Sequence, residues 1–427
     1  MSNIDDDVEK KRKALTIRGL SGLRNIGNTC YMNSIIQCIS SLDIFRSWLI
    51  SHKFETRLFI NIACKLAEIN RKKQKLDNDA KVHVSPQDIN VMMQSTVVYN
   101  LAELLKGMWG QNSIVTPKSF KKAIGDICPT FRGYNQNDSQ ELLNLIIDKV
   151  HEETEKKTVQ VTYKNIPECV QNYIEVYSEC IDKLNDPDID IDTKEKYLKY
   201  LNDYKKEHTN DVIISNAYIS WKKHVQTSHS IITDLFTGLF FNKITCDECN
   251  SISSSFEPFT SLSIQTKITG NTTLIESMNE FTKEEILNGD NQYFCETCNK
   301  KVNAKKQIYI WEPPNILIIH LKRFKNERWR TTKTSSTVGF PINDFDINNY
   351  LSNLHPVKNT IYDLCAISEH RGECNFGHYI AYCKNNINNK WYEFDDSSVY
   401  HVPYEELEKE LVTKNAYVLF YVRRLNH

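Results

Sequence analysis

Cys30 stands where a polar loop with glycines meets an apolar helical pattern. Residues 22–39 read GLRNIGNTCYMNSIIQCI, and the turn and cap residues before the cysteine predict that a helix begins at Thr29 or Cys30. After the cysteine, apolar residues recur at the spacing of one buried helix face: Met32, Ile35, Ile36 and Ile39. A thiol at a helix start faces unpaired N–H groups and the positive end of the helix dipole, which lower its pKa from about 8.5. The position favours a nucleophile, although a free cysteine is more commonly a small buried apolar residue.

A histidine and two carboxylates near the C-terminus have the types that would complete a thiol catalyst. The segment GHYIAY puts His378 at the start of a predicted strand, and KWYEFDD puts Asp395 and Asp396 on the next one. Adjacent strands of a hairpin would set His378 beside Asp395. Because successive strand residues face opposite sides, only one of the two aspartates can reach the imidazole directly. A lone histidine is more often structural, but a cysteine at a helix start, a histidine and a carboxylate together are the parts of a thiol protease.

Four further cysteines form two CxxC pairs, Cys246-Asp-Glu-Cys249 and Cys295-Glu-Thr-Cys298. Four thiolates in two such pairs are the ligand set of a tetrahedral structural zinc. The long segment between the pairs must hold strands or a helix that return the chain to the site. Redox-active pairs and unpaired thiols are the alternatives, but two CxxC pairs on predicted hairpins favour zinc. Because sulfur would fill all four positions, the sequence predicts one structural zinc and no catalytic cofactor.

Composition limits the class of protein. The chain has 427 residues, 40% apolar and 25% charged, which is ordinary for a globular protein of two or three domains. The net charge of −1 gives no overall field that would attract nucleic acid or an anionic membrane. The start, MSNIDDDVEKKRK, lacks the apolar core of a secretory signal, and no apolar run has the ~20 residues of a membrane span. Because 13 cysteines cannot all pair, we expect an intracellular, reducing location, cytoplasmic or nuclear.

The elements that must position these residues follow from the pattern along the chain. Residues 1–19 carry acidic and basic runs with little to bury, and we expect a disordered tail. Residues 20–150 are mostly helical in pattern, with Asp138 as a candidate N-cap of one amphipathic helix. Residues 158–212 hold two amphipathic patterns without a catalytic group, which predicts an inserted helical pair. From about residue 230 onward the pattern changes to strands.

Several longer motifs together resemble the ubiquitin-specific protease family, whose members are papain-like ubiquitin carboxyl-terminal hydrolases. The motifs are GLRNIGNTCYMNS, YNQNDSQELL, DLFTGLF, the two CxxC pairs, LIIHLKRF, and GHYIAY with WYEFDD, in the order that the family shows. The resemblance covers the chain from about residue 22 to the end, interrupted by residues 158–212. It implies an α+β fold in one catalytic domain over residues 20–427, in place of two or three domains. Within that domain we expect a helical thumb at about 20–150, and a β palm with zinc-tipped β fingers at about 230–427.

The resemblance also implies roles for individual residues. Cys30 would be the nucleophile, His378 its general base and acid, and Asp395 the group that orients the imidazole. Asn25 matches the oxyanion-hole side chain of the family, and its amide N–H could act there beside the backbone N–H of Cys30. Asp396 would support the oxyanion side or a water.

A second set of residues matches the family segments around the extended C-terminal tail of ubiquitin. Gln136 and Asp138 match the segment that holds this tail. Asn137 is a departure, because many relatives carry glutamine or histidine there. The two loops over the tail correspond to about residues 326–338 and 369–377, which are charged and polar here, as expected of mobile lids.

The resemblance therefore implies a cysteine isopeptidase that removes ubiquitin from protein conjugates or ubiquitin chains through an acyl-enzyme on Cys30. Its partners would be ubiquitin and ubiquitinated proteins, with no nucleic acid and no membrane. Two alternatives remain open: a protease for another ubiquitin-like modifier, and an inactive ubiquitin-binding module. The usual sign of an inactive relative, loss of the cysteine or the histidine, is absent. A zinc-based nucleic-acid binder is disfavoured by the net charge and by the lack of a basic aromatic patch.

Overall fold

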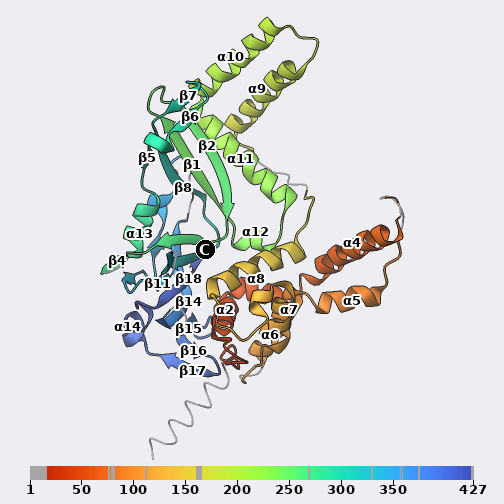
Figure 1. The fold of residues 1–427 in the computed structure, drawn as a ribbon, viewed down its shortest axis with the longest axis vertical. Helices are drawn as coiled ribbons and strands as arrows, with labels where there is room; N and C mark the ends of the chain where they lie inside the picture. Colours follow the sequence, from red (N-terminus) through yellow and green to blue (C-terminus); the bar gives the residue numbers. More distant parts are fainter. Residues whose placement is uncertain are drawn as a thin grey trace, which may run out of the picture.

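The computed structural model describes residues 17–75, 77, 82–110, 113–159, 166–267, 270–327, 330–355, 357, 359–373 and 376–424. Figure 1 shows three parts, which we call the thumb, the palm and the fingers. The thumb is the group of helices from the first third of the chain, the palm is the large sheet beside it, and the fingers are a narrower sheet that extends away from both. Of the predicted tail over residues 1–19, residues 1–16 lie outside the described part.

The thumb is built from helices whose apolar faces meet one another. Their bounds are α2 Cys30–Ser41, α3 Asp43–Ile50, α4 Glu55–Gln74, α5 Pro86–Gln94, α6 Val97–Gly110, α7 Lys118–Ile127, η1 Pro129–Phe131 and α8 Ser139–Thr154. α2 is central, because it lies between α3 and α8 on one side and the palm strands β14 (Ile361–Glu373) and β15 (Phe376–Lys384) on the other. Every residue of α2 before Ser41 is buried. Full burial of a side chain such as Ile36 contributes about 1.5–3 kcal/mol to folding.

The helices after the thumb differ in part from the prediction. α9 (Glu168–Asn185) and α10 (Ile191–Glu207) are the two helices expected within residues 158–212, and Figure 1 shows them projecting past the end of the fingers. A third helix, α11 (Thr209–Thr227), follows directly and runs across residue 212, and the short α12 (Ile231–Leu235) comes next. α11 packs on both α9 and the finger strand β2 (Ile252–Phe259). Because α11 has two packing partners, its apolar residues lie on more than one face of the helix. Its sequence therefore lacks a single row of apolar residues at helical spacing.

The palm is an eight-stranded sheet in the order β17-β16-β15-β14-β18-β9-β3, with β13 paired to β14 beside this path. Its strands, apart from β14 and β15, are β3 Leu262–Gln265, β9 Ile316–Lys322, β13 Phe345–Asp346, β16 Trp391–Asp395, β17 Ser398–Val402 and β18 Ala416–Arg423. Neighbours are antiparallel except β3 and β9. Alternation along each strand gives the sheet two apolar faces: Ile318 packs in a core shared with the thumb, whereas Ile319 packs in a second core on the opposite face.

The second core is closed by α13 (Leu274–Phe281) and α14 (Leu407–Leu411). The shorter elements around the palm are β4 Asn271–Thr273, β10 Phe324–Glu327, β11 Arg330–Lys333, β12 Thr337–Gly339, η3 Asn348–Tyr350 and η4 Tyr404–Glu406. β10 and β11 form a two-stranded hairpin, and β12 pairs with β4. Among the described residues, no helix is both long enough and apolar enough to cross a bilayer.

The fingers are a four-stranded sheet in the order β2-β1-β8-β5. Besides β2, the strands are β1 Gly238–Cys246, β5 Glu285–Leu287 and β8 Ala304–Glu312, with η2 Gly289–Asn291 after β5. β1 lies between β2 and β8 and pairs antiparallel with both along its length. A small hairpin of β6 (Tyr293–Cys295) and β7 (Lys300–Val302) lies where β1 ends, so that the two CxxC pairs come from adjoining strand ends.

Candidate active site

The loop before Cys30 is held by the side chain of Asn25. Asn25 Oδ1 accepts hydrogen bonds from the backbone N–H groups of Gly27 and Thr29, both at 3.1 Å. Thr29 Oγ1 accepts a hydrogen bond from Ile26 N at 3.0 Å. Gly27 has φ of 106°, in the left-handed region that glycine adopts without strain. α2 then begins at Cys30, as predicted, which puts a thiol that is 3% exposed at the N-terminus of a buried helix.

His378 and Asp395 meet between neighbouring palm strands. β15 and β16 pair antiparallel, with Ala381 opposite Phe394, and this pairing brings His378 Nε2 to 2.7 Å from Asp395 Oδ1. The pKa of His378 is raised to about 9, first by a hydrogen bond with the side chain of Cys30 and then by Asp395, while desolvation opposes the rise. A histidine whose ring is held by a carboxylate can take the proton of a neighbouring thiol as a general base.

Asp396 contacts the loop before Cys30 instead of the imidazole. Its Oδ2 accepts a hydrogen bond from Asn25 Nδ2 at 2.9 Å, and its Oδ1 accepts one from Asn33 Nδ2 at 2.7 Å. Its backbone carbonyl accepts a hydrogen bond from Leu23 N at 2.7 Å. Asp396 has φ of 48°, which is uncommon for a residue other than glycine. The two adjacent aspartates therefore have different partners: Asp395 bonds to His378, and Asp396 bonds to Asn25. The Nδ2 of Asn25 carries a second N–H besides the one that Asp396 accepts.

Gln136 and Asp138 come from the loop that leads into α8. Gln136 Nε2 donates a hydrogen bond to Gly377 O at 2.7 Å, and Gln136 Oε1 accepts one from Gly377 N at 3.1 Å. Asp138 is the N-cap of α8, as predicted, and its Oδ1 accepts a hydrogen bond from Gln140 N at 2.7 Å. Its Oδ2 accepts a hydrogen bond from the hydroxyl of Tyr417 at 2.5 Å. Each residue of this pair thus has partners inside the protein.

The segment 369–377 is not the loop that was expected. Its described residues belong to β14 and β15, which pair from Glu373 and Phe376 inward. Glu369 is fully buried, and burial raises its pKa to about 7. The expected first loop, residues 326–338, contains parts of β10, β11 and β12, while residues 328–329 lie outside the described part. The two segments touch: Lys333 Nζ donates hydrogen bonds to His370 O at 2.6 Å and Gly372 O at 2.9 Å.

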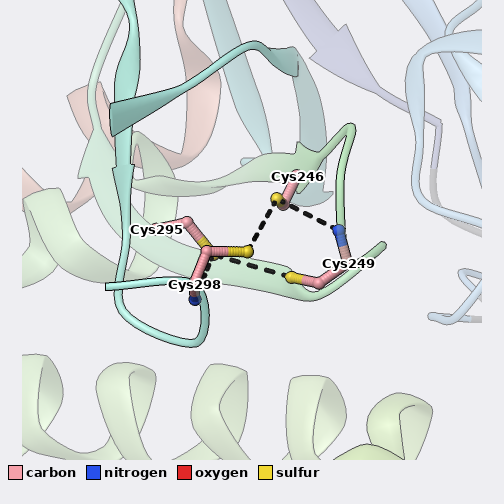
Figure 2. Close-up of side chains that lie close together, drawn as sticks. All are labelled: Cys246, Cys249, Cys295 and Cys298. Atoms are coloured by element: carbon pink, nitrogen blue, oxygen red, sulfur yellow. Dashed lines mark hydrogen bonds between the residues drawn. The ribbon is translucent and has the colours of Figure 1, made fainter. Parts of the chain in front are cut away.

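The four cysteines of the two CxxC pairs converge at the end of the fingers (Figure 2). Their Sγ atoms all lie within 4.8 Å of one another, with 3.9 Å between Cys246 and Cys298 and 3.7 Å between Cys249 and Cys295. Zinc that is held by four sulfurs at ~2.3 Å places those sulfurs about 3.8 Å apart. The four residues therefore fit a tetrahedral metal ion in type and in spacing.

The two pairs share one local conformation. Cys249 N donates a hydrogen bond to Cys246 Sγ at 3.4 Å, and Cys298 N donates one to Cys295 Sγ at 3.5 Å. Each pair is followed by an asparagine in the left-handed region, with φ of 56° at residue 250 and 51° at residue 299. Asparagine tolerates this region better than most residues. N–H groups directed at sulfur favour the thiolate form that binds a metal.

Some site residues carried too little signal in the sequence to be identified. Asn33 sits three residues after Cys30, and its hydrogen bond to Asp396 has no signal in the sequence, because Ser34 and Gln37 are polar residues of the same helix. Gly377 and Tyr417 contact Gln136 and Asp138 from strands far along the chain, and no local pattern announces these contacts.

A thiol at the start of a central helix, with a histidine and a carboxylate on adjacent palm strands, is the arrangement found in the class of papain-like thiol proteases. The family model described as ubiquitin carboxyl-terminal hydrolase matches residues 21–421. The chain belongs to the ubiquitin carboxyl-terminal hydrolase family, and its thumb, palm and fingers are those of the ubiquitin-specific proteases.

Comparison with individual proteins agrees with this assignment. Ubiquitin carboxyl-terminal hydrolase 2 of Gallus gallus is 30% identical over 414 residues, which cover 96% of this chain and 95% of the relative. The Homo sapiens protein of that name is 31% identical over 408 residues, covering 95% of this chain and 55% of the relative. The chain thus spans about half the length of the mammalian relatives it matches. A probable ubiquitin carboxyl-terminal hydrolase of Acanthamoeba polyphaga mimivirus is 28% identical, covering 99% of this chain and 94% of the relative.

A solved structure supports the fold. The SAGA Ubp8/Sgf11/Sus1/Sgf73 DUB module bound to ubiquitin aldehyde matches with a TM-score of 0.62 and 22% identity, covering 100% of this chain and 77% of that chain. A second structure of this module, bound to monoubiquitin, matches with a TM-score of 0.63 and 22% identity, covering 100% of this chain and 76% of that chain.

Proposed function

We propose that this chain is a thiol-dependent deubiquitinase that cleaves the bond after the C-terminal glycine of ubiquitin, on protein conjugates or on ubiquitin chains. The observation that carries the proposal is the environment of Cys30. Its thiol lies at the start of α2 and is the first cause of the raised pKa of His378, whose Nε2 is 2.7 Å from Asp395 Oδ1. Membership of the ubiquitin carboxyl-terminal hydrolase family supports ubiquitin as the modifier that is released.

In this mechanism the Cys30 thiolate attacks the carbonyl carbon of the terminal glycine of ubiquitin. The His378 imidazolium gives its proton to the leaving lysine amine as the C–N bond breaks, which leaves ubiquitin as a thioester on Cys30. Neutral His378 then takes a proton from water, whose oxygen attacks the thioester and releases the ubiquitin carboxylate. Asp395 holds the imidazole through Nε2 in both steps, so the other ring nitrogen, Nδ1, is the one that serves the thiol and the amine.

The oxyanion of each tetrahedral intermediate would be stabilised by two N–H groups, from the Asn25 side chain and the Cys30 backbone. The hydrogen bonds of Asn25 support this role, because its Oδ1 is occupied by the N–H groups of its own loop and its Nδ2 is held by Asp396. Such an amide is oriented before substrate binds. Loss of one oxyanion donor costs roughly 10²–10³ in rate in other proteases.

Ubiquitin would approach with its extended tail along the junction of thumb and palm, where Gln136 and Asp138 lie. The negative charge of Asp138 suits the arginines that precede the terminal Gly-Gly of ubiquitin. Structural neighbours of this chain are bound to ubiquitin aldehyde and to monoubiquitin, which supports ubiquitin as the partner.

One structural zinc would be held by Cys246, Cys249, Cys295 and Cys298. The spacing of the four sulfurs supports this assignment. The metal would supply a crosslink between the end of β1 and the β6–β7 hairpin, and no step of the reaction involves it.

The test is reaction of the protein with ubiquitin that carries a C-terminal electrophile, followed by mapping of the modified residue. We expect one covalent adduct, on Cys30. Cys30→Ala should abolish both the adduct and hydrolysis while ubiquitin binding is retained. Cys64 is an exposed free thiol and serves as the internal control for non-specific alkylation.

Three results would overturn the proposal. An adduct that persists in Cys30→Ala would place the nucleophile elsewhere. Binding of ubiquitin without any adduct or turnover in the wild type would indicate an inactive ubiquitin-binding module. Faster reaction with the matching electrophile of another ubiquitin-like modifier than with that of ubiquitin would change the substrate.

A further inference from the structure

Within the described part of the chain, the first residues of β15 pair with a neighbouring strand on one side only. On that side β14 pairs with β15 from Phe376 onward, with Gly372 opposite Gly377. On the other side the ladder with β16 begins at Ala381. His378 therefore lies on a part of the strand that does not pair with β16, although its imidazole bonds to Asp395 and has its pKa raised first by Cys30.

The unsupported side of this segment is covered from the thumb by Gln136. The side-chain amide donates to the carbonyl of Gly377 at 2.7 Å and accepts from its N–H at 3.1 Å. One amide side chain thus provides the donor and the acceptor that a neighbouring strand would provide. The two residues are 241 positions apart in the sequence, so this contact fixes the thumb and the palm relative to each other beside the site.

Gly377 is also confined on another side. A Cβ atom at this position would lie 1.9 Å from Nε2 of His370, so only glycine fits. His370 is itself 2% exposed and its ring packs at 4.6 Å from the ring of Tyr379. Gly377 is therefore wedged between a buried ring and the Gln136 amide.

We infer that Gln136 is a positioning residue for His378: it fixes the backbone of Gly377, and thereby the starting point of the side chain that faces Cys30. The inference rests on the proposed function for the identity of the reaction. Asp395 fixes the far end of the ring, whereas Gln136 fixes the backbone from which the ring extends. This role is separate from holding the ubiquitin tail, because Gly377 engages the amide oxygen and one N–H of the amide nitrogen before any substrate is present.

The two roles are separated by a reaction that needs no ubiquitin. Iodoacetamide alkylates thiolates, so its rate at Cys30, followed by mass spectrometry of the peptide across a pH series, reports the thiolate that His378 supports. Gln136→Met keeps the length of the side chain and removes the amide. We expect slower alkylation of Cys30 at neutral pH in this variant, with an unchanged rate at the exposed Cys64 of the same molecules.

Turnover of a ubiquitin substrate supplies the second readout. We expect kcat of Gln136→Met to fall by up to about a hundredfold with KM nearly unchanged, since a displaced catalytic group costs rate and not binding. Gln136→Glu keeps the acceptor for Gly377 N and loses the donor, so its loss should lie between those of the wild type and Gln136→Met. Gln171→Ala, an exposed glutamine on α9, is the matched control and should behave as wild type.

The melting temperature of each variant shows whether it is folded. If iodoacetamide alkylates Cys30 of Gln136→Met with the wild-type pH profile, the inference is wrong, whatever happens to turnover. A raised KM with unchanged alkylation would mean that Gln136 serves the tail alone. If alkylation is altered in Gln136→Met but the wild type itself does not hydrolyse ubiquitin, the positioning role is upheld and only the proposed substrate is refuted.

Discussion

The hydroxyl of Tyr417 on β18 donates a 2.5 Å hydrogen bond to Oδ2 of Asp138, the N-cap of α8. Tyr417 is buried, and burial followed by the charge of Asp138 raises the pKa of its phenol, which therefore stays protonated as a donor. The other carboxylate oxygen, Oδ1, accepts hydrogen bonds from the backbone N–H groups of Gln140 and Glu141 in the first turn of α8. A single carboxylate thus joins the palm sheet to the N-terminus of α8.

This dual use makes Asp138→Asn an informative substitution. Asparagine caps a helix about as well as aspartate, and its amide can still pair with Tyr417, but it carries no charge. We expect a higher KM for ubiquitin substrates, because a charge-assisted contact with a tail arginine is lost, with little change in melting temperature. Steady-state kinetics and thermal melting measure the two effects.

Replacement of a tail arginine of ubiquitin by alanine provides the control for this prediction. That change should cost Asp138→Asn much less than it costs the wild type. If the two losses simply add, Asp138 and the tail do not interact. Its role would then be that of a cap, worth about 0.5–2 kcal/mol of stability and revealed by Asp138→Ala.

The two adjacent aspartates should differ in their effect on turnover. Asp395→Ala removes the carboxylate 2.7 Å from His378, whereas Asp396→Ala removes the partner of Asn25 and Asn33. We expect the larger loss of kcat for Asp395→Ala, because the imidazole takes part in both steps of the reaction. Equal losses, or a larger loss for Asp396→Ala, would show that orientation of the oxyanion-side amide matters more than orientation of the ring.

The pH dependence follows from the raised pKa of His378. Its value in the folded protein is about 9, against 6.5 for an ordinary histidine, so the protonated ring is favoured by its contacts with Cys30 and Asp395. The stabilisation is complete below pH 6.5 and is lost as the pH rises through about 9. We expect kcat/KM to fall on the alkaline side with an apparent pKa near 9, the value of the folded-state imidazole.

Asp395→Asn tests the cause of that shift. The variant keeps a side chain of the same shape and removes the charge, so the alkaline fall should move to lower pH. The free energy of unfolding, measured in urea, should be higher for the wild type than for His378→Gln below pH 6.5. This difference should shrink as the pH rises from 6.5 to 9. An alkaline fall at the same pH in Asp395→Asn would assign the raised pKa to Cys30 alone.

Metal analysis of the purified protein should give one zinc per chain. Structural zinc is worth ~10–16 kcal/mol in apparent binding, so chelation or Cys295→Ser should unfold or aggregate the fingers. Cys38→Ser, a change to a buried thiol outside the cluster, should leave the zinc content unchanged. Folded, active protein without zinc would contradict the assignment.

Much of the site was readable from the sequence, because its parts depend on neighbours along the chain. The cap residues and the apolar spacing after Cys30 located the start of α2, and Asp138 marked the start of α8. Strand alternation placed His378 and Asp395 on one hairpin, where the separation is only 17 residues. The two CxxC pairs identified the four cysteines that come within 4.8 Å of one another.

Only the tertiary structure decided which polar groups meet between thumb and palm. Asn25 meets Asp396 across 371 residues, Tyr417 meets Asp138 across 279, and Gln136 meets Gly377 across 241. Residues 369–373 read as part of a polar loop, yet they extend β14, because they pair with the first residues of β15 and Glu369 also pairs with β18. Single hydrogen bonds between distant segments leave no periodic pattern in a sequence, and they exist because α2 packs against the palm sheet and α8 packs against α2.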